Sequence, residues 1–224
     1  MIDPSVAEIA MALREIGFPP RFRDDELRVL IGVLKYVAEG HPLSPRQIEQ
    51  VATSIPMPLD AATSFLGQLS ECDEEGNVVG VFGLSQRKHP HQFKVNDQTL
   101  STWCAWDALF LPAMLGQTAA VESSCPATKA GIRVRMTPEK VEEAQPTGSV
   151  VTIAVPNVAG TGLKSVETIW KTFCCFVHFF VSKESAVEWI SAKNQNLRIL
   201  SVEQAHQLGQ TVFQRSLEHV ENRT

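Results

Sequence analysis

The stretch DDELRVLIGVLKYVAE, residues 24–39, anchors the fold that the sequence predicts. Its apolar residues recur every three or four positions, which is typical of an amphipathic helix. A short helix with the same spacing is expected before it, over residues 1–18. After it, Ser44–Gln47 (SPRQ) has the pattern of a capping box with proline at the first helical position. We expect this box to open a helix to Thr53, and a further helix to cover residues 58–71.

Two strands are expected next. Residues 78–84 and 93–95 are the apolar runs, and the polar stretch 86–91 between them has the composition of a loop. Three helices followed by two strands is the order of a winged-helix module. We therefore expect a winged-helix-like N-terminal module over residues 1–98.

Beyond residue 98 strands and helices alternate. A helix is expected from Trp103, bent or ended near Pro112. Strands are expected at about 118–123, 131–136, 149–155 and 173–181, a short helix opens at Thr137–Glu139, a loop covers Pro156–Gly162, and closing helices cover 182–193 and 201–220. This pattern predicts an α+β protein, in which residues 99–224 form a mixed, mainly antiparallel sheet domain with flanking helices.

Composition restricts the class of protein. The chain has 224 residues, a formal net charge of −5 and only 20% charged residues, which is typical of a globular protein without extended disorder. No stretch has the roughly twenty apolar residues of a membrane span, and the N-terminus lacks the pattern of a signal peptide. We therefore expect a cytoplasmic protein with no membrane partner, whose cysteines are thiols.

The expected helix 58–71 would be the recognition helix of a DNA-binding winged-helix protein. It contains no Lys or Arg and carries Asp60 and Glu71. Helices that read DNA need cations near phosphates and donors at base edges. The few cations of the expected wing do not compensate, so we expect no nucleic-acid partner.

The first of two cysteine motifs is WCAWD, residues 103–107. Cys104 is expected in the first turn of its helix, where unpaired backbone N–H groups and the helix dipole favour a thiolate. Asp107 lies three residues later on the same helix face, so the two side chains can exchange a proton. The apolar neighbours predict a dry setting, in which a carboxyl group resists ionisation. The alternative is a packed cysteine and a surface aspartate on an amphipathic helix.

The second motif is FCCFVHFF, residues 173–180. On a strand, Cys174 and Cys175 point to opposite faces and cannot easily share one metal ion. Cys175 then lies on a uniformly apolar face, whereas Cys174 shares its face with His178. We therefore expect Cys174 at a site and Cys175 in the core. The alternative is a strand buried on both sides, with His178 satisfied by a hydrogen bond.

Other thiol chemistries fit less well. Cys175 and His178 have the spacing of zinc ligands but the wrong parity on a strand, and Cys104 with Asp107 is a poor second pair, so a structural zinc protein is a weak alternative. A cysteine hydrolase with His178 as its base is another. Cys125 stands in a polar loop and is a candidate third thiol near the site.

Together these motifs resemble those of organomercurial lyase, also called alkylmercury lyase. The resemblance rests on residues 103–107, on the stretch that ends at Cys125 and on residues 173–180, in this order, with weaker support from Leu208–Gln210. It implies an enzyme that cleaves the carbon–mercury bond, and an N-terminal winged-helix-like domain that does not bind DNA. A thiolate-based metal-sensing transcriptional regulator is the alternative function, and the lack of cations on the helix 58–71 argues against it.

The resemblance also implies which residues act. By motif position, the catalytic set is Cys104, Cys174 and Asp107. Mercury(II) is soft, so thiolates bind it far better than oxygen ligands do. We expect the two cysteines to bind the mercury of an alkyl- or arylmercury substrate and Asp107 to pass a proton to its carbon, releasing a hydrocarbon and Hg(II). No organic cofactor is expected, and the resemblance implies that external thiols or a mercuric reductase take the product ion.

Overall fold

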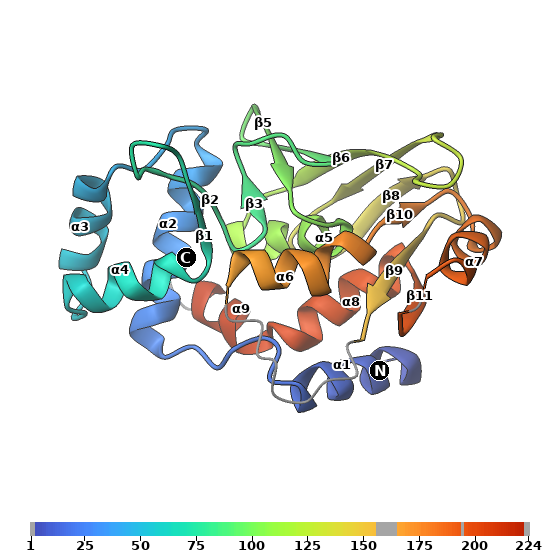
Figure 1. The fold of residues 1–224 in the computed structure, drawn as a ribbon, viewed down its shortest axis with the longest axis horizontal. Helices are drawn as coiled ribbons and strands as arrows, with labels where there is room; N and C mark the ends of the chain where they lie inside the picture. The colour runs from blue at the N-terminus through green and yellow to red at the C-terminus, as the bar shows by residue number, and fades with distance from the viewer. Residues whose placement is uncertain (1–2, 156–164, 194, 222–224) are drawn as a thin grey trace.

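The computed structural model describes residues 3–155, 165–193 and 195–221. Helices gather at one end and along the lower face in Figure 1, and a long antiparallel sheet forms the opposite upper face. The helices are α1 (Pro4–Glu15), α2 (Asp24–Ala38), α3 (Pro45–Thr53), α4 (Leu59–Gly67), α5 (Ala105–Leu115), α6 (Val166–Thr172), α7 (Lys183–Ser191), α8 (Val202–Val212) and α9 (Gln214–Glu221), with a 3-10 helix η1 over Cys174–Phe176.

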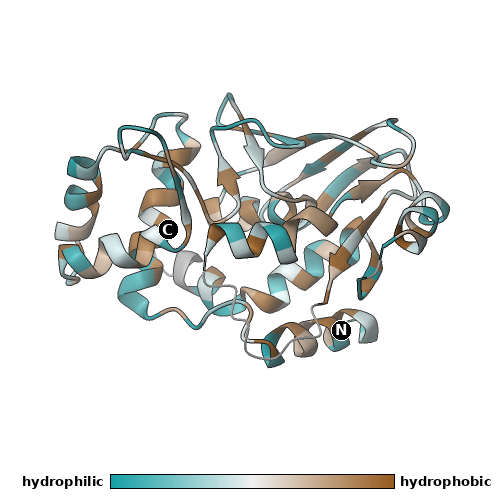
Figure 2. Cartoon of the chain, viewed as in Figure 1, coloured by the Kyte–Doolittle hydropathy of each residue, from teal (hydrophilic) through white to brown (hydrophobic). Residues whose placement is uncertain are grey.

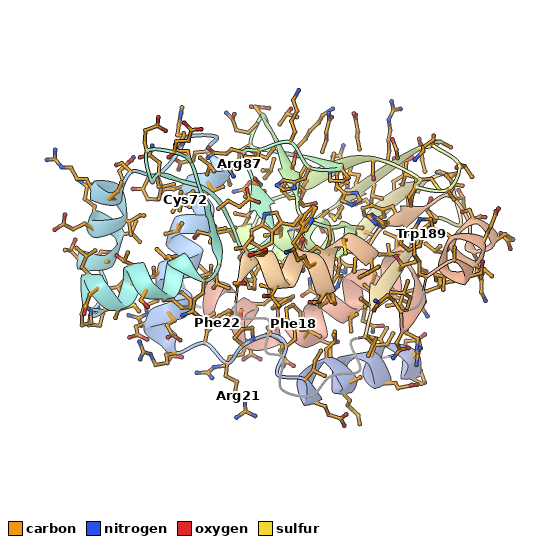
Figure 3. All side chains as sticks on the ribbon, in the orientation of Figure 1. Phe18, Arg21, Phe22, Cys72, Arg87 and Trp189 are labelled. Carbon is orange, nitrogen blue, oxygen red and sulfur yellow. The ribbon has the colours of Figure 1, made fainter. Side chains whose placement is uncertain are left out.

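The N-terminal helices form where the sequence predicts them. The capping box before α3 is present, since the Ser44 N–H donates to Gln47 Oε1 at 2.9 Å and the Gln47 N–H donates back to Ser44 Oγ. Helix α4 ends at Gly67, before the expected residue 71, because the chain from Ser70 onward joins a strand. Figure 3 shows Arg21 pointing away from the body of the molecule, whereas the neighbouring phenylalanines are buried in the core.

The large sheet has eight strands, all paired antiparallel, in the order β1-β2-β3-β5-β4-β6-β7-β8. Their bounds are β1 (Ser70–Cys72), β2 (Val78–Val81), β3 (Leu84–Ser85), β4 (His91–Val95), β5 (Gln98–Thr102), β6 (Ala119–Ser124), β7 (Gly131–Met136) and β8 (Val141–Gln145). Burial alternates along β7, so one face of the sheet covers the core and the other faces outward. A second sheet has the order β10 (Phe179–Phe180), β9 (Val150–Ala154), β11 (Leu197–Ser201).

Helix α5 lies at the centre of the molecule. Ten of its eleven residues are buried, and it contacts α2, α8 and α9 as well as both sheets. A helix that is apolar on every side is stable only when it is enclosed in this way. Figure 2 shows α5 and β9 mostly in hydrophobic colours, whereas α3 and α7 on the outside carry more hydrophilic ones. The start of α5 is therefore held in position by the packing of this helix against α2, α8, α9 and both sheets.

The fold class predicted from the sequence, α+β with N-terminal helices and a mainly antiparallel sheet, is confirmed. The winged-helix character of the first module and the division at residue 98 stay predictions. The strands on both sides of that position pair in one sheet, because β5 lies between β3 and β4. The loop expected at Pro156–Gly162 lies outside the described residues.

Three local predictions are wrong. Residues 173–181 are not one strand: η1 follows α6, and only Phe179–Phe180 pair in a sheet. The stretch 78–84 is broken by a turn at Phe82 and Gly83, whose φ angles are +50° and +95°. No helix opens at Thr137, because its hydroxyl accepts the N–H groups of the next residues and turns the chain into β8.

The sequence predicts no membrane span, and the described helices can be compared with the requirements for one. Among the helices of residues 3–155, 165–193 and 195–221, none combines the length and the apolar character needed to cross a bilayer.

Candidate active site

The structure brings the three predicted site residues together. The Sγ atoms of Cys104 and Cys174 and a carboxylate oxygen of Asp107 all lie within 4.8 Å of one another. The three residues are 0%, 2% and 8% exposed, respectively. Two thiols and a carboxyl group so close together, and so far from water, form a site that can hold one soft metal atom and a proton carrier beside it.

The start of α5 positions two of these side chains. Cys104 has extended backbone angles and is the N-cap residue, so the helix begins at Ala105 rather than at the expected Trp103. The Cys104 N–H donates to Oδ2 of Asp107 at 2.7 Å, which is the reciprocal bond of a capping box. Thr102 Oγ1 donates to the Cys104 carbonyl at 2.9 Å and fixes the chain on the other side. The helix continues through Pro112 to Leu115.

Cys174 reaches the site from the short helix η1. The Ala105 N–H donates to the Val177 carbonyl at 3.1 Å and joins this segment to the first residue of α5. On its other side Thr152 of β9 donates to the Phe176 carbonyl at 2.7 Å and accepts the His178 N–H at 3.0 Å. The choice of Cys174 agrees with this geometry, but the reason for it was wrong, because the alternation of a strand does not apply to a 3-10 turn.

Aromatic side chains enclose the site. The ring of Phe173, next to Cys174, stacks on Phe18 at 5.4 Å and lies 5.8 Å from Trp106. Trp106 itself donates its indole N–H to the Ala205 carbonyl of α8 at 2.9 Å. Segments from both ends of the chain therefore seal the region behind the two thiols, which explains why it is dry.

Burial governs the protonation of the site. It raises the pKa of the Cys104 thiol well above its usual range, and a hydrogen bond with Cys174 raises it further. For Cys174, that hydrogen bond lowers the pKa, but burial and the charge of Asp107 outweigh it and the net direction is upward. Burial raises the pKa of Asp107 to about 7, against the hydrogen bonds from Cys104. A group with this pKa both accepts and donates protons near neutral pH.

Two interactions with Asp107, one steric and one electrostatic, were not predicted from the sequence. The Cα of Gly83 faces the Asp107 carboxyl group so closely that a Cβ at this position would lie 2.6 Å from Cγ. A glycine inside an apparent strand is a known sign of close backbone approach, so this signal was available. The charge of His89 lowers the pKa of Asp107. His89 lies 3.1 Å from Glu71 Oε1 and beside the ring of Trp170 in α6, and its loop position gave no sequence signal.

The other candidate residues lie outside the cluster of three. His178 Nε2 contacts the Cys175 carbonyl at 3.0 Å, which is the hydrogen-bonded alternative considered for it. Cys175 is half-exposed and donates to the Lys171 carbonyl, so the expectation that it lies in the core is wrong. Cys125 is buried, with its sulfur 3.9 Å from Ser185 Oγ.

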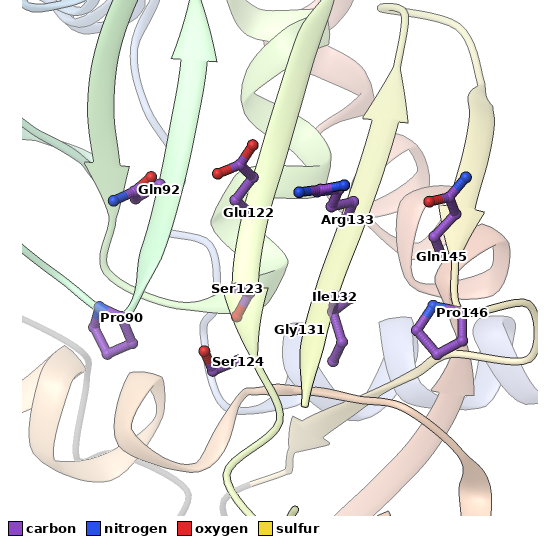
Figure 4. Close-up of a pocket in the computed structure, with 10 residues that line it drawn as sticks. All are labelled: Pro90, Gln92, Glu122, Ser123, Ser124, Gly131, Ile132, Arg133, Gln145 and Pro146. Atoms are coloured by element: carbon purple, nitrogen blue, oxygen red, sulfur yellow. The ribbon is translucent and has the colours of Figure 1, made fainter. Parts of the chain in front are cut away.

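A surface groove of about 690 Å³ lies on the outer face of the large sheet, away from the thiols. Gln92, Glu122, Arg133 and Gln145 cross its floor on four neighbouring strands, in one register row (Figure 4). None of its lining residues belongs to the cluster, so its polar surface is separate from the chemistry of the thiols.

Comparison with known proteins shows the family to which the chain belongs. The family model described as alkylmercury lyase matches residues 84–214, a span that holds Cys104, Asp107 and Cys174. An alkylmercury lyase of Pseudomonas putida is 32% identical over 219 residues, which cover 97% of this chain and 96% of the relative. The chain belongs to the alkylmercury lyase family. The resemblance found in the sequence is thereby confirmed.

Further relatives agree with this membership. The alkylmercury lyase of Staphylococcus epidermidis is 34% identical over 179 residues, covering 79% of this chain and 77% of that protein. A solved structure of the mercury-bound form of MerB2 superposes with a TM-score of 0.74 at 18% identity, over 96% of this chain and 100% of that one. At that identity the superposition shows that the two proteins share a fold.

Proposed function

We propose that this member of the family cleaves the carbon–mercury bond of alkyl- and arylmercury compounds by protonolysis. In this proposal Cys104 and Cys174 bind the mercury and Asp107 carries the proton. The supporting observation is that two sulfurs and a carboxylate oxygen lie within 4.8 Å of one another in a buried site. Thiolates prefer soft ions such as Hg(II), and a carboxyl group beside them supplies the proton that the carbon needs.

The two thiol protons of the resting site account for all the protons that the reaction needs. The pKa of each thiol is raised by its surroundings, so both sulfurs start protonated at neutral pH. When R–Hg⁺ reacts with two thiols, two S–Hg bonds form and the Hg–C bond breaks. One thiol proton ends on carbon as R–H, and the other is released to solvent. No electron is gained or lost, so neither an oxidant nor a reductant takes part.

Cys174 is the first cysteine to bind in this scheme. The interaction between the two thiols lowers the pKa of Cys174 and raises that of Cys104, so Cys174 is the thiol that gives up its proton more readily. Asp107, with a pKa of about 7, accepts the proton that mercury displaces. Asp107 releases this first proton to solvent and then accepts the proton of the Cys104 thiol, whose sulfur binds as the second ligand. The added electron density on mercury weakens the bond to carbon.

Asp107 next returns a proton to the carbon. Its carboxyl group is held beside both sulfurs by the Cys104 N–H, so it stands next to any mercury atom that the sulfurs share. The buried setting excludes most water, which leaves Asp107 as the proton donor at hand among the described residues. The hydrocarbon leaves, and Hg(II) stays on the two sulfurs.

External thiols complete the turnover in our proposal. Exchange of thiolates transfers a soft ion without an organic cofactor, and a mercuric reductase is a further acceptor that the family suggests. The site works only with free thiols, so we also propose that the protein acts in a reducing compartment such as the cytoplasm.

Release of benzene from phenylmercury acetate with excess thiol, followed by gas chromatography, tests the function. We expect wild type to release benzene, and Cys104→Ser and Cys174→Ser to retain less than about a tenth of that activity. Cys175→Ala removes the half-exposed thiol next to Cys174 and is the matched control, with activity close to wild type. No benzene from folded wild-type protein would overturn the proposal, and full activity in either serine variant would remove that cysteine from it.

A further inference from the structure

The turn between β2 and β3 meets the start of α5 at three places. The Trp103 N–H donates to the Gly83 carbonyl at 2.9 Å. The Cα of Gly83 faces Asp107, and the ring of Phe82 lies 5.8 Å from the ring of Phe110, one helical turn after that aspartate. The turn therefore packs along the first turns of α5, with contacts at Trp103, Asp107 and Phe110, rather than at a single point.

The contact with Asp107 leaves no room for a side chain on residue 83. An ideal Cβ there would lie 2.6 Å from Cγ, 2.7 Å from Oδ1 and 2.8 Å from Cβ of Asp107. These distances are shorter than any van der Waals contact. Meanwhile Oδ2 is held by the Cys104 N–H. The carboxyl group is therefore fixed by a hydrogen bond on one oxygen and by the Gly83 backbone against the other.

The turn itself is rigidly anchored. Phe82 has a φ of +50°, which is unusual for a bulky residue and persists only where the surroundings impose it. Its N–H donates to the Leu69 carbonyl at 3.0 Å. Its ring makes edge contacts with Phe22, Phe110 and Phe213, which belong to three different parts of the chain. Because Phe82 is held by so many contacts, the backbone of the next residue, Gly83, is fixed in position.

We infer that the Phe82–Gly83 turn is a positioning element for proton delivery, which holds the Asp107 carboxyl group in line with the atom that the two sulfurs share. This inference rests on the proposed function. Proton transfer to carbon depends on the direction of the donor, and a misplacement of about 1 Å can slow an enzyme about a hundredfold. Mercury binding depends on the sulfurs, and neither is among the three atoms nearest to a Cβ on Gly83. The two steps should therefore separate when the turn is altered.

Gly83→Ala is the test, and Gly148→Ala is its matched control. Gly148 has a φ of +86°, close to that of Gly83, but nothing lies within 4 Å of its Cβ position. Both variants place a side chain at a similar positive φ, and only one meets Asp107. We expect Gly83→Ala to bind phenylmercury at wild-type stoichiometry, measured by loss of titratable thiols, while benzene formation in a single turnover slows at least about tenfold. Gly148→Ala should match wild type in both measurements.

A folded Gly83→Ala enzyme that forms benzene within about twofold of the wild-type rate would overturn the inference. Inactive wild-type protein would instead count against the proposed function, so the two failures are distinct. If Gly83→Ala folds poorly, urea unfolding of Gly83→Ala, Asp107→Ala and the double variant replaces the kinetic test. Removing the carboxyl group relieves the contacts with Cγ and Oδ1 and leaves the 2.8 Å contact with Cβ, so the loss of stability from Gly83→Ala should shrink in the Asp107→Ala background. An unchanged loss would show that a side chain at residue 83 does not press on the Asp107 carboxyl group.

Discussion

The backbone N–H of Cys104 donates a hydrogen bond to Oδ2 of Asp107 across 2.7 Å. One turn of helix therefore carries both a thiol for mercury and the carrier of its proton, and the Gly83 backbone packs against that carrier from outside the helix. The bond also stabilises the ionised carboxylate, whereas burial disfavours it. Burial wins and raises the pKa of Asp107 to about 7. Because the pKa of Asp107 differs between the folded and the unfolded chain, the free energy of unfolding depends on pH.

Asp107→Asn should make the protein more stable at pH 8 than wild type. In the unfolded chain this carboxyl group ionises near its ordinary value of 3.8, whereas in the fold it stays protonated to about 7. Between these pH values the native state binds the additional proton, so wild-type stability falls as pH rises and the loss is complete above 7. Asn is neutral and its side-chain oxygen can still accept the Cys104 N–H. The gain is at most about 4 kcal/mol at pH 8 and disappears near pH 4.

Urea unfolding at pH 4, 6 and 8 measures this difference. Asp97→Asn is the control, since Asp97 is exposed and has a positive φ that asparagine also tolerates. Its stability should differ little from wild type at each pH. A stability difference between Asp107→Asn and wild type that stays constant from pH 4 to pH 8 would contradict the raised pKa.

His89→Gln should raise the pKa of Asp107. The charge of His89 lowers the pKa of Asp107, and His89 is held in place by Glu71 at 3.1 Å. Glutamine carries no charge, so the interaction that lowers the pKa of Asp107 is lost and the carboxyl group ionises only at a higher pH. We expect the inflection that Asp107 causes in the rate of benzene release against pH to move to higher pH. His41→Gln changes an exposed histidine elsewhere and should leave the inflection in place; equal profiles for both variants would exclude this role of His89.

The sequence predicted the parts of the site that depend on local spacing. Cys104 and Asp107 are three residues apart at the start of one helix, and such a spacing brings their side chains to one helix face. Cys174 was chosen for a parity that does not exist, because residues 173–181 form a helix end, a 3-10 turn and a two-residue strand. The apolar run in this segment is typical of a buried strand, and periodicity alone does not separate it from other buried structure.

The contacts that complete the site could not be predicted in this way. Gly83 and His89 belong to a hairpin and a loop that precede α5, and their distance from Asp107 depends on how β2, β3 and β4 pair. Strand β8 was also missed, since its exposed, charged residues lack the alternation of a half-buried strand. The contacts of Gly83 and His89 and the strand β8 all depend on how separate segments pair, and the sequence of a single segment does not encode this pairing.

Cys104→Ser should bind phenylmercury faster than Cys174→Ser does. In our scheme Cys174 forms the first bond to mercury, because the interaction between the two thiols lowers the pKa of Cys174 and raises that of Cys104. Serine at position 104 leaves the Cys174 sulfur in place, so the first step should stay within a few fold of wild type. Without the Cys174 sulfur, the remaining thiol is the one whose pKa burial raises most, and binding should be at least about tenfold slower. Stopped-flow release of a proton on mixing measures the step, and the reverse order of rates would assign the first attack to Cys104.

Gly209→Ala should destabilise the protein by about 1–3 kcal/mol, because it forces α8 away from α5. A Cβ on Gly209 would lie 2.8 Å from Cβ of Phe110, on the helix that carries the site, and 3.6 Å from the indole nitrogen of Trp106. Gly67 is also helical, but nothing lies within 4 Å of its Cβ position, so Gly67→Ala isolates the effect of helix propensity and should be neutral or stabilising by up to about 1 kcal/mol. Urea unfolding of both variants checks the difference. Equal stability would mean that the two helices can separate at no cost, and that the hydrogen bond from Trp106 to Ala205 does not hold them at this distance.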